Sequence, residues 1–180
     1  NTDPFLQDPW GIAIDPGVSF IVANSVHGRV FSLDAAGVRS APPGFSVPNP
    51  AGTAPAAPTG IVLNPNSLFR DQNSIPPFIT SSITVTADGG IYFWAVNADR
   101  TFLPQATLVV DHSQLGAVYT AVAILKPDCC APFLAVANFH TGKVEVYSTS
   151  FAPLGSFLDP SLPSGYAPFG MQVIGNQLFI

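Results

Sequence analysis

Residues 22–30 read VANSVHGRV, and residues 136–144 read VANFHTGKV. Both stretches follow the pattern V-A-N-x-x-x-G-x-V, and they begin 114 positions apart (136 − 22). In each, an apolar run leads into a polar turn that contains glycine, and a second alternating run leaves the turn. Asn bonds nearby backbone and Gly accepts positive φ, so both suit tight turns. The duplicated stretch therefore predicts two equivalent β-hairpins.

A third turn of the same kind, TADGG, occupies residues 86–90. The turn glycines Gly28, Gly89 and Gly142 are separated by 61 (89 − 28) and 53 (142 − 89) residues. Repeats of ~40–50 residues with several short strands are typical of β-propeller blades, and inserted loops explain the longer spacing. The turn-forming repeat positions are predicted to be Asn24, Gly28, Asp88, Gly89, Asn138 and Gly142.

A Pro-x-Gly sequence precedes an alternating apolar run at three places, DPWGIAID, APTGIVLN and APFGMQVI. Together with the turns, these entries predict an all-β β-propeller in a single domain. We expect blades at about residues 9–47, 58–110 and 117–157, and a fourth that starts near residue 167. Propellers close rings of 4–8 blades, and an open ring would expose long strand edges. The domain is therefore expected to be incomplete at its C-terminus, or to be closed by a second chain.

The composition favours short strands and turns over helices. Only 9% of the residues are charged, against roughly 25% in an average domain, and the chain has 19 Pro and 15 Gly. Six Lys and Arg with a net charge of −5 argue against nucleic-acid binding. No apolar run approaches the ~20 residues of a membrane span, and the first residues do not resemble a signal peptide. The few lysines favour an extracellular or cell-surface location.

Six segments occur in a characteristic order: NTDPFLQDPWGIAIDP, APTGIVLN, ADGGIYFW, GAVYTAVAI, ANFHTGKVEVY and DPSLPSGYAPFGMQVIGNQLFI. Together they resemble a family of uncharacterised secreted β-propeller proteins related to NHL-repeat propellers, found in bacteria and some eukaryotes. The resemblance covers nearly the whole chain and implies six blades, of which this chain holds the N-terminal half. The SVHG turn and the adjacent cysteines depart from the family pattern. The resemblance implies no particular activity.

Histidines are the first candidates for chemistry. His27 and His140 lie in equivalent turns and are weak candidates for a central channel, although surface turns are the simpler interpretation. Two imidazoles do not make a metal site, which needs three or four ligands. His112 stands between Asp111 and Ser113, but neighbours in an extended segment point to opposite faces and do not form a triad. We expect His112 in a loop after an outer strand.

The single glutamate of the chain, Glu145, lies between Val144 and Val146 in a predicted strand. It should point away from the two valines, and we expect it to be solvated. Propeller hydrolases of the lactonase type bind a divalent ion through one Glu and several Asn or Asp. A cation such as calcium is implied only under that alternative, and no calcium-loop motif occurs. No cofactor and no catalytic residue are predicted.

Cys129 and Cys130 are adjacent, which leaves open a strained disulfide, separate partners, or two small buried thiols. Residues 41–58, rich in Pro and Ala, resemble a wall-associated linker that carries O-glycans. No N-glycosylation sequon occurs. The aromatic residues at the blade landmarks belong by default between blades, and the alternative is a carbohydrate-stacking surface.

These observations predict an extracellular structural or interaction module that displays loops to a protein partner or to copies of itself. A metal-dependent propeller hydrolase of the lactonase type is the enzymatic alternative. A carbohydrate-binding module is the third hypothesis, and it requires two or more exposed aromatic side chains on one face.

Overall fold

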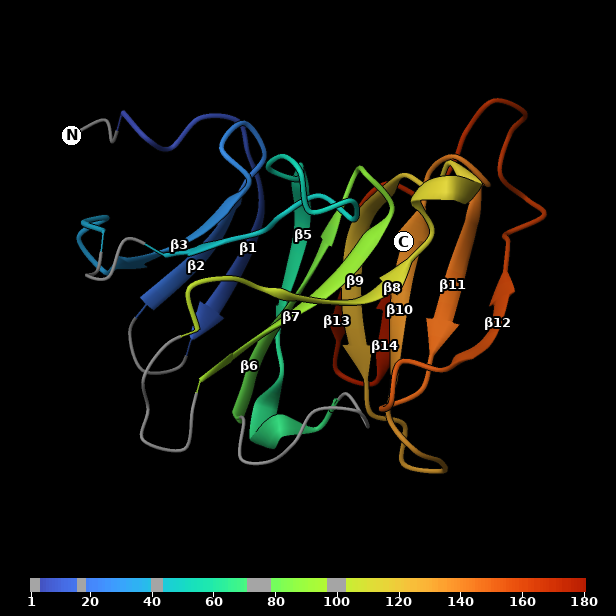
Figure 1. The fold of residues 1–180 in the computed structure, drawn as a ribbon. Helices are drawn as coiled ribbons and strands as arrows, with labels where there is room; N and C mark the ends of the chain where they lie inside the picture. Colours follow the sequence, from blue (N-terminus) through green and yellow to red (C-terminus); the bar gives the residue numbers. More distant parts are fainter. Residues whose placement is uncertain (1–3, 16–18, 40–43, 71–78, 97–102) are drawn as a thin grey trace.

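A computed structural model describes residues 4–15, 19–39, 44–70, 79–96 and 103–180. Within these ranges the regular structure is almost entirely β (Figure 1). The exceptions are two short 3-10 helices, η1 (Pro65–Ser67) and η2 (Ser113–Leu115). In this part of the chain no helix is long and apolar enough to cross a membrane.

The strands form three four-stranded antiparallel sheets and one hairpin, each built from consecutive strands. Because neighbouring sheets contact each other through their first strands, the arrangement is that of β-propeller blades around an axis. Blade 1 contains β1 (Pro9–Asp15), β2 (Ser19–Asn24), β3 (Arg29–Asp34) and β4 (Phe45–Ser46); blade 2 contains β5 (Pro58–Leu63), β6 (Ile79–Thr86), β7 (Gly90–Val96) and β8 (Thr107–Asp111); blade 3 contains β9 (Tyr119–Leu125), β10 (Phe133–Asn138), β11 (Lys143–Tyr147) and β12 (Pro153–Phe157); the hairpin contains β13 (Gln172–Ile174) and β14 (Gln177–Phe179).

The first two Pro-x-Gly entries mark places where the first strands of two blades approach closely. The strand register shifts between Pro9 and Gly11, and again between Pro58 and Gly60. A Cβ on Gly11 would lie 3.0 Å from the Cα of Gly60, and a Cβ on Gly60 would lie 3.1 Å from the Cα of Ala121. Glycine is therefore required where β1 meets β5 and where β5 meets β9.

The repeated polar turn residues connect each turn to the segment that enters the same blade. Asn24 donates from Nδ2 to the carbonyl of Phe5 at 2.5 Å. The Oδ2 of Asp88 accepts from the backbone N–H of Ala57 at 2.6 Å. The Oδ1 of Asn138 accepts from the N–H of Val118 at 3.3 Å. In all three blades a polar side chain of the turn region thus connects the turn to the entering segment, although Asn24 donates whereas Asp88 and Asn138 accept.

The turns differ in detail from a turn in which the Asn side chain bonds the backbone N–H of the residue two positions later. Asn24 and Asn138 instead accept bonds from the N–H groups three residues on, those of His27 and Thr141, each at 3.3 Å. In blade 2, Thr86 is the residue at the strand end, and its Oγ1 accepts from the N–H of Gly90 at 3.1 Å. The turn glycines Gly28, Gly89 and Gly142 have φ values of 55°, 81° and 68°.

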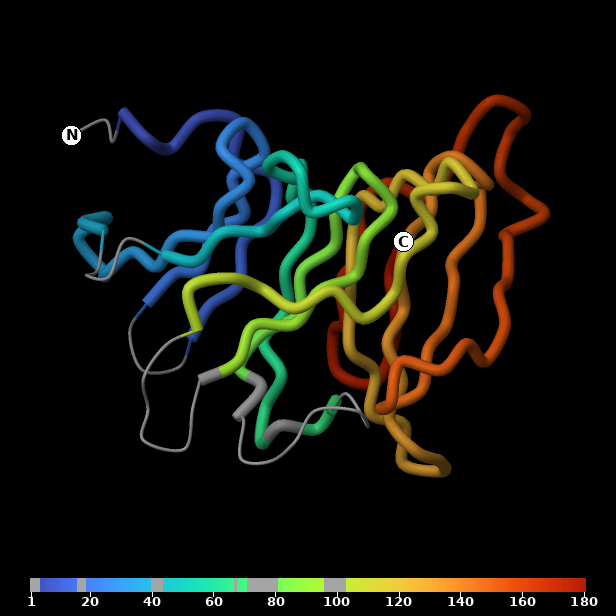
Figure 2. Tube along the Cα trace, viewed as in Figure 1, coloured from blue at the N-terminus to red at the C-terminus, as the bar shows by residue number. Residues whose placement is uncertain are grey.

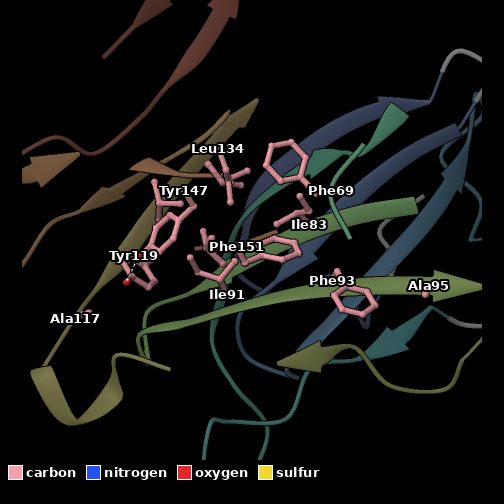
Figure 3. Close-up of a cluster of buried hydrophobic side chains, with 13 residues drawn as sticks. Phe69, Ile83, Ile91, Phe93, Ala95, Ala117, Tyr119, Leu134, Tyr147 and Phe151 are labelled. Atoms are coloured by element: carbon pink, nitrogen blue, oxygen red, sulfur yellow. Dashed lines mark hydrogen bonds between the residues drawn. The ribbon is translucent and has the colours of Figure 1, made fainter. Parts of the chain in front are cut away.

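The hydrophobic core lies between the blades, in three clusters. Blades 1 and 2 enclose one cluster, and blade 3 packs against the hairpin β13–β14 in another. Figure 3 shows the largest cluster, between blades 2 and 3, where Tyr119, Leu134 and Tyr147 of blade 3 face Ile83 and Ile91 of blade 2. Apolar burial between sheets is the dominant stabilising term in such an arrangement.

The segment expected to be a glycan-bearing linker is largely part of the fold. Its described portion begins at residue 44, because residues 41–43 lie outside the described ranges. Phe45, Val47 and Ala56 are buried between blades 1 and 2, and Phe45 stacks on Trp94 with ring centroids 4.3 Å apart. The linker interpretation was therefore wrong for these residues, because alternating apolar side chains within the Pro-rich sequence complete a core.

The outer edges of blades 1 and 2 are also connected by backbone hydrogen bonds. Ser46 of β4 donates from its N–H to the carbonyl of Pro104 at 3.1 Å, and its carbonyl accepts from Ala106 at 2.9 Å. Figure 2 shows the segment before β8 running back across blade 2 toward blade 1. This contact fixes the two blades relative to each other at their outer strands, in addition to the inner-strand contacts.

Candidate functional site

A cleft of about 1270 Å³ lies along the first strands of the blades. Its walls are formed by β1, β5 and β9 and by the segment that leads into β13. Apolar side chains dominate the lining. Polar side chains on it include Asp15, Thr59, Asn64, Thr120 and Lys126.

The middle residues of the first and third Pro-x-Gly entries contact each other at one part of this cleft. Trp10 and Phe169, from the first and third entries, have ring centroids 5.5 Å apart. Phe169 also meets Phe139, from the β10–β11 turn, edge-on at 6.0 Å. Their exposed fractions are 46% for Trp10, 51% for Phe169 and 46% for Phe139. We call these three residues the aromatic mouth, and they satisfy the requirement of exposed aromatic side chains on one face.

The corresponding residues of the other two blades are threonines. Thr59, from the second entry, donates from Oγ1 to the carbonyl of Tyr119 at 2.6 Å. Thr120 takes the equivalent place in β9, where its hydroxyl is buried without a hydrogen-bond partner among the described residues. The mouth of the cleft therefore combines aromatic surface with buried hydroxyl groups.

The repeat also reveals a sheet face that the described residues leave uncovered. Ile61 of β5 packs against blade 1, and its counterpart Val122 of β9 packs against blade 2. Their exposed fractions are only 6% and 7%. The counterpart in β1 is Ile12, which is 63% exposed, and Ile14 on the same face is 67% exposed. We call Ile12 and Ile14 the open face of β1.

The densest polar cluster of the described chain surrounds Glu145 of β11. Its Oε2 accepts from the hydroxyls of Tyr147 at 2.5 Å and Tyr119 at 2.8 Å. Its Oε1 accepts from Nδ2 of Asn138 at 2.7 Å. The Nδ1 of His112, in the connection between blades 2 and 3, lies 2.7 Å from the Tyr119 hydroxyl and 3.5 Å from Oε2. The cluster thus ties three strands of blade 3, β9, β10 and β11, to one carboxylate, and His112 of the connection from blade 2 lies beside it.

Burial and hydrogen bonding act in opposite directions on this carboxylate. Partial burial raises the pKa of Glu145, but the hydrogen bonds from Tyr147, Asn138 and Tyr119 outweigh it, and the net shift is downward. Burial is also the main cause that raises the pKa of Tyr119 and of Tyr147 far above the ordinary tyrosine value. The tyrosines therefore remain protonated donors and Glu145 remains an ionised acceptor at neutral pH.

The expectation of a solvated Glu145 was wrong. Alternation correctly predicted that Glu145 points to the other side of the sheet from Val144 and Val146. Its cross-strand partner Val136 lies on the same side and belongs to the core between blades 2 and 3. That side faces blade 2 and not solvent, so the carboxylate is half-buried. A sequence signal was available in Tyr147, two residues on and therefore on the same face.

His112 follows β8, and its ring is directed to Tyr119. Asp111 and Ser113 bond each other instead, with the Ser113 hydroxyl 2.6 Å from Oδ1 of Asp111. The three residues do not form a triad. The sequence had indicated a loop position for His112 but not its contact with the Glu145 cluster, which depends on how blades 2 and 3 pack.

The other sequence candidates lie apart from this cluster. His27 is half-buried in the β2–β3 turn, and His140 is exposed in the β10–β11 turn next to Gly116. Cys129 and Cys130 are both exposed free thiols, so the alternative of two buried thiols was wrong. Among the described residues no three His, Cys, Asp or Glu side chains are grouped as a metal site would require.

Comparison with known proteins identifies the fold but does not identify an activity. No family model matches the chain. Two uncharacterised proteins of Acanthamoeba polyphaga mimivirus are similar in sequence. R640 is 29% identical over 133 residues, which cover 68% of this chain and 23% of R640. R648 is 26% identical over 190 residues, which cover all of this chain and 44% of R648. The chain spans less than half the length of these relatives.

Solved structures with the same fold include two bacterial proteins. A putative 6-phosphogluconolactonase from Bacteroides uniformis aligns with a TM-score of 0.58 and 18% identity, over 89% of this chain and 46% of that protein. The PQQ-bound aldose sugar dehydrogenase from Streptomyces coelicolor aligns with a TM-score of 0.52 and 16% identity, over 93% of this chain and 52% of that one. At these identities the likeness is one of fold, and the fold is a β-propeller.

Proposed function

We propose that this chain is a structural and interaction module of an extracellular or cell-surface assembly, and that it associates with copies of itself through the open face of β1. The observation that carries the proposal is the contrast between Ile12 and its repeat counterparts Ile61 and Val122, which neighbouring blades bury. Among the described blades, which do not close a ring, this repeat position presents apolar side chains to solvent only in β1. Exposed apolar surface of this kind marks association sites.

The composition supports the same proposal. With 9% charged residues the chain has few groups that would oppose contact between copies. The extracellular location and the relation to NHL-repeat propellers belong to the proposal, and they are supported by the low lysine content and by the sequence segments described above. O-glycosylation of the Pro-rich segment belongs to it as well, at residues outside its buried core positions.

Sedimentation velocity over a dilution series tests the association. We expect the wild-type chain to form dimers or larger species as its concentration rises. The double variant Ile12→Ser/Ile14→Ser should remain monomeric at the same concentrations, because burial of two isoleucines is worth about 2–3 kcal/mol, roughly a 100-fold change in dissociation constant.

Leu115→Ser is the matched control, since Leu115 is an exposed aliphatic residue of η2 away from the open face. It should associate like the wild type. A wild-type chain that stays monomeric throughout, or a control variant that loses association equally, would rule out this use of the open face.

A carbohydrate-binding module is the second candidate, and the aromatic mouth favours it. Sugar rings stack on exposed aromatic faces. Titration of a Trp94→Phe variant with soluble oligosaccharides, such as chitohexaose or laminarihexaose, would report binding through the fluorescence of Trp10. Saturable quenching or a spectral shift that Phe169→Ala abolishes would support this candidate, and an unchanged spectrum would count against it.

The lactonase-type alternative receives less support from the described residues. The similar Bacteroides protein is named a putative 6-phosphogluconolactonase, but the cleft of this chain is lined mainly by apolar side chains. Glu145, the single glutamate of the sequence, is directed between blades 2 and 3, where tyrosine and asparagine donors occupy both of its oxygens. The described donor set does not fit a divalent cation held by several carboxylates.

A further inference from the structure

The turn between β9 and β10 presents two thiols side by side at the surface. Cys129 and Cys130 are both exposed and free, and their Sγ atoms lie 2.8 Å apart. A disulfide bond requires ~2.05 Å, so the two sulfur atoms are less than 1 Å from bonding distance. Pro127 and Pro132 flank the pair and restrict the backbone on both sides.

From this geometry we infer that Cys129 and Cys130 form a reversible redox site, which closes to a disulfide between neighbouring residues on reaction with a small-molecule disulfide such as oxidised glutathione. The site is independent of the cleft and of the open face, and it goes beyond the proposed interaction function. Neither thiol contributes to the three buried core clusters. Closure therefore does not require the blades to unpack.

The reaction balances in two exchange steps. A thiolate of one cysteine attacks a sulfur of oxidised glutathione, forms a mixed disulfide and releases one glutathione thiolate. The second cysteine, as its thiolate, then attacks the protein sulfur of the mixed disulfide and releases the second glutathione. The protein loses two protons and two electrons, and oxidised glutathione is reduced to two molecules of glutathione.

Reversibility follows from the strain and exposure of the product. Adjacent cysteines close an eight-membered ring that departs from relaxed disulfide geometry. Strained and exposed disulfides have more oxidising potentials than buried structural ones, and glutathione reduces them readily. The pair is therefore suited to switching between two states, and it is poorly suited to permanent cross-linking.

Alkylation and intact-mass measurement test the inference on the folded chain. After incubation with oxidised glutathione, the number of alkylatable thiols should fall from two to none. The mass should fall by two hydrogens, with no glutathione attached, and reduced glutathione should restore both thiols. The Cys130→Ser variant lacks the second thiol, so it should retain one glutathione as a stable mixed disulfide. Circular dichroism verifies that the variant is folded.

A second probe addresses the reduced state. Phenylarsine oxide binds two neighbouring thiols as a cyclic chelate, so one molecule should remain on each reduced wild-type chain after washing and none on Cys130→Ser. Wild-type protein that accumulates glutathione adducts or disulfide-linked dimers, in place of the closed ring, would overturn the inference. Failure of the reduced wild-type chain to retain the arsenical would overturn it as well.

Discussion

Replacement of Glu145 by alanine is expected to lower the free energy of unfolding by about 3 kcal/mol. The carboxylate accepts hydrogen bonds from Tyr119, Tyr147 and Asn138. Without it, partly buried donors of blade 3 lose their acceptor, and each such group costs ~1–3 kcal/mol. Urea unfolding monitored by circular dichroism measures the difference.

Lys143→Gln is the control, because Lys143 lies two residues earlier on the same strand and is exposed. Its effect should stay within about 0.5 kcal/mol, as is usual for surface substitutions. A Glu145→Ala variant as stable as this control would show that the carboxylate does not stabilise blade 3 through these three donors.

The contribution of Glu145 should also depend on pH. Its pKa is lowered in the folded state, so its stabilising effect is fully present above the unfolded pKa of ~4.3 and is lost as the pH falls through the folded value. The stability difference between the wild type and Glu145→Gln should therefore be larger at pH 7 than at pH 3. An equal difference at both pH values would contradict the assignment of an ionised, hydrogen-bonded carboxylate.

Substitution of alanine at two equivalent turn glycines should give very different results. Gly89→Ala is expected to cost about 3 kcal/mol and Gly142→Ala about 1 kcal/mol. Both residues have positive φ, which costs an alanine ~1–2 kcal/mol. At Gly89 the new Cβ would also lie 2.9 Å from the carbonyl oxygen of Ala117 and 3.0 Å from the backbone of His112 and Ser113, whereas at Gly142 nothing lies within 4 Å.

The pair is its own control, since backbone strain is common to both variants and only the crowding differs. Thermal unfolding of the two variants in parallel measures the difference. In the fold, the connection from blade 2 to blade 3 packs over the β6–β7 turn. Equal destabilisation of the two variants would contradict this packing.

The fold could be predicted from the sequence because the repeat carries it. The V-A-N turn marks the same place in blades 1 and 3, and the first two Pro-x-Gly entries mark the same place in blades 1 and 2. At these places glycine is needed for turn geometry or close strand approach. The two glycines Gly89 and Gly142 look equivalent in the sequence, however. Only the path of the next connection decides which of them is crowded.

The candidate site could be predicted only in part. Alternation placed Glu145 on the correct face of its strand, but sequence alone does not show which blade covers that face. The Pro- and Ala-rich composition of residues 41–58 predicted a linker. The apolar side chains of Phe45 and Val47 alternate with Ser46, and this pattern was a signal for the β-structure in the described part of the segment. The contrast between Ile12 and Ile61 required the structure, because equivalent sequence positions differ there only in their neighbours.

Association between copies of the chain should cover the open face of β1. Acrylamide quenching of Trp10 in a Trp94→Phe background tests this most directly, because Trp10 lies two residues before Ile12 on β1, is 46% exposed and is the remaining tryptophan. Quenching should decrease severalfold as the protein concentration rises through the association range, and it should stay high when Ile12→Ser and Ile14→Ser are added. Quenching that is the same in dilute and concentrated protein would show that association does not cover the open face of β1.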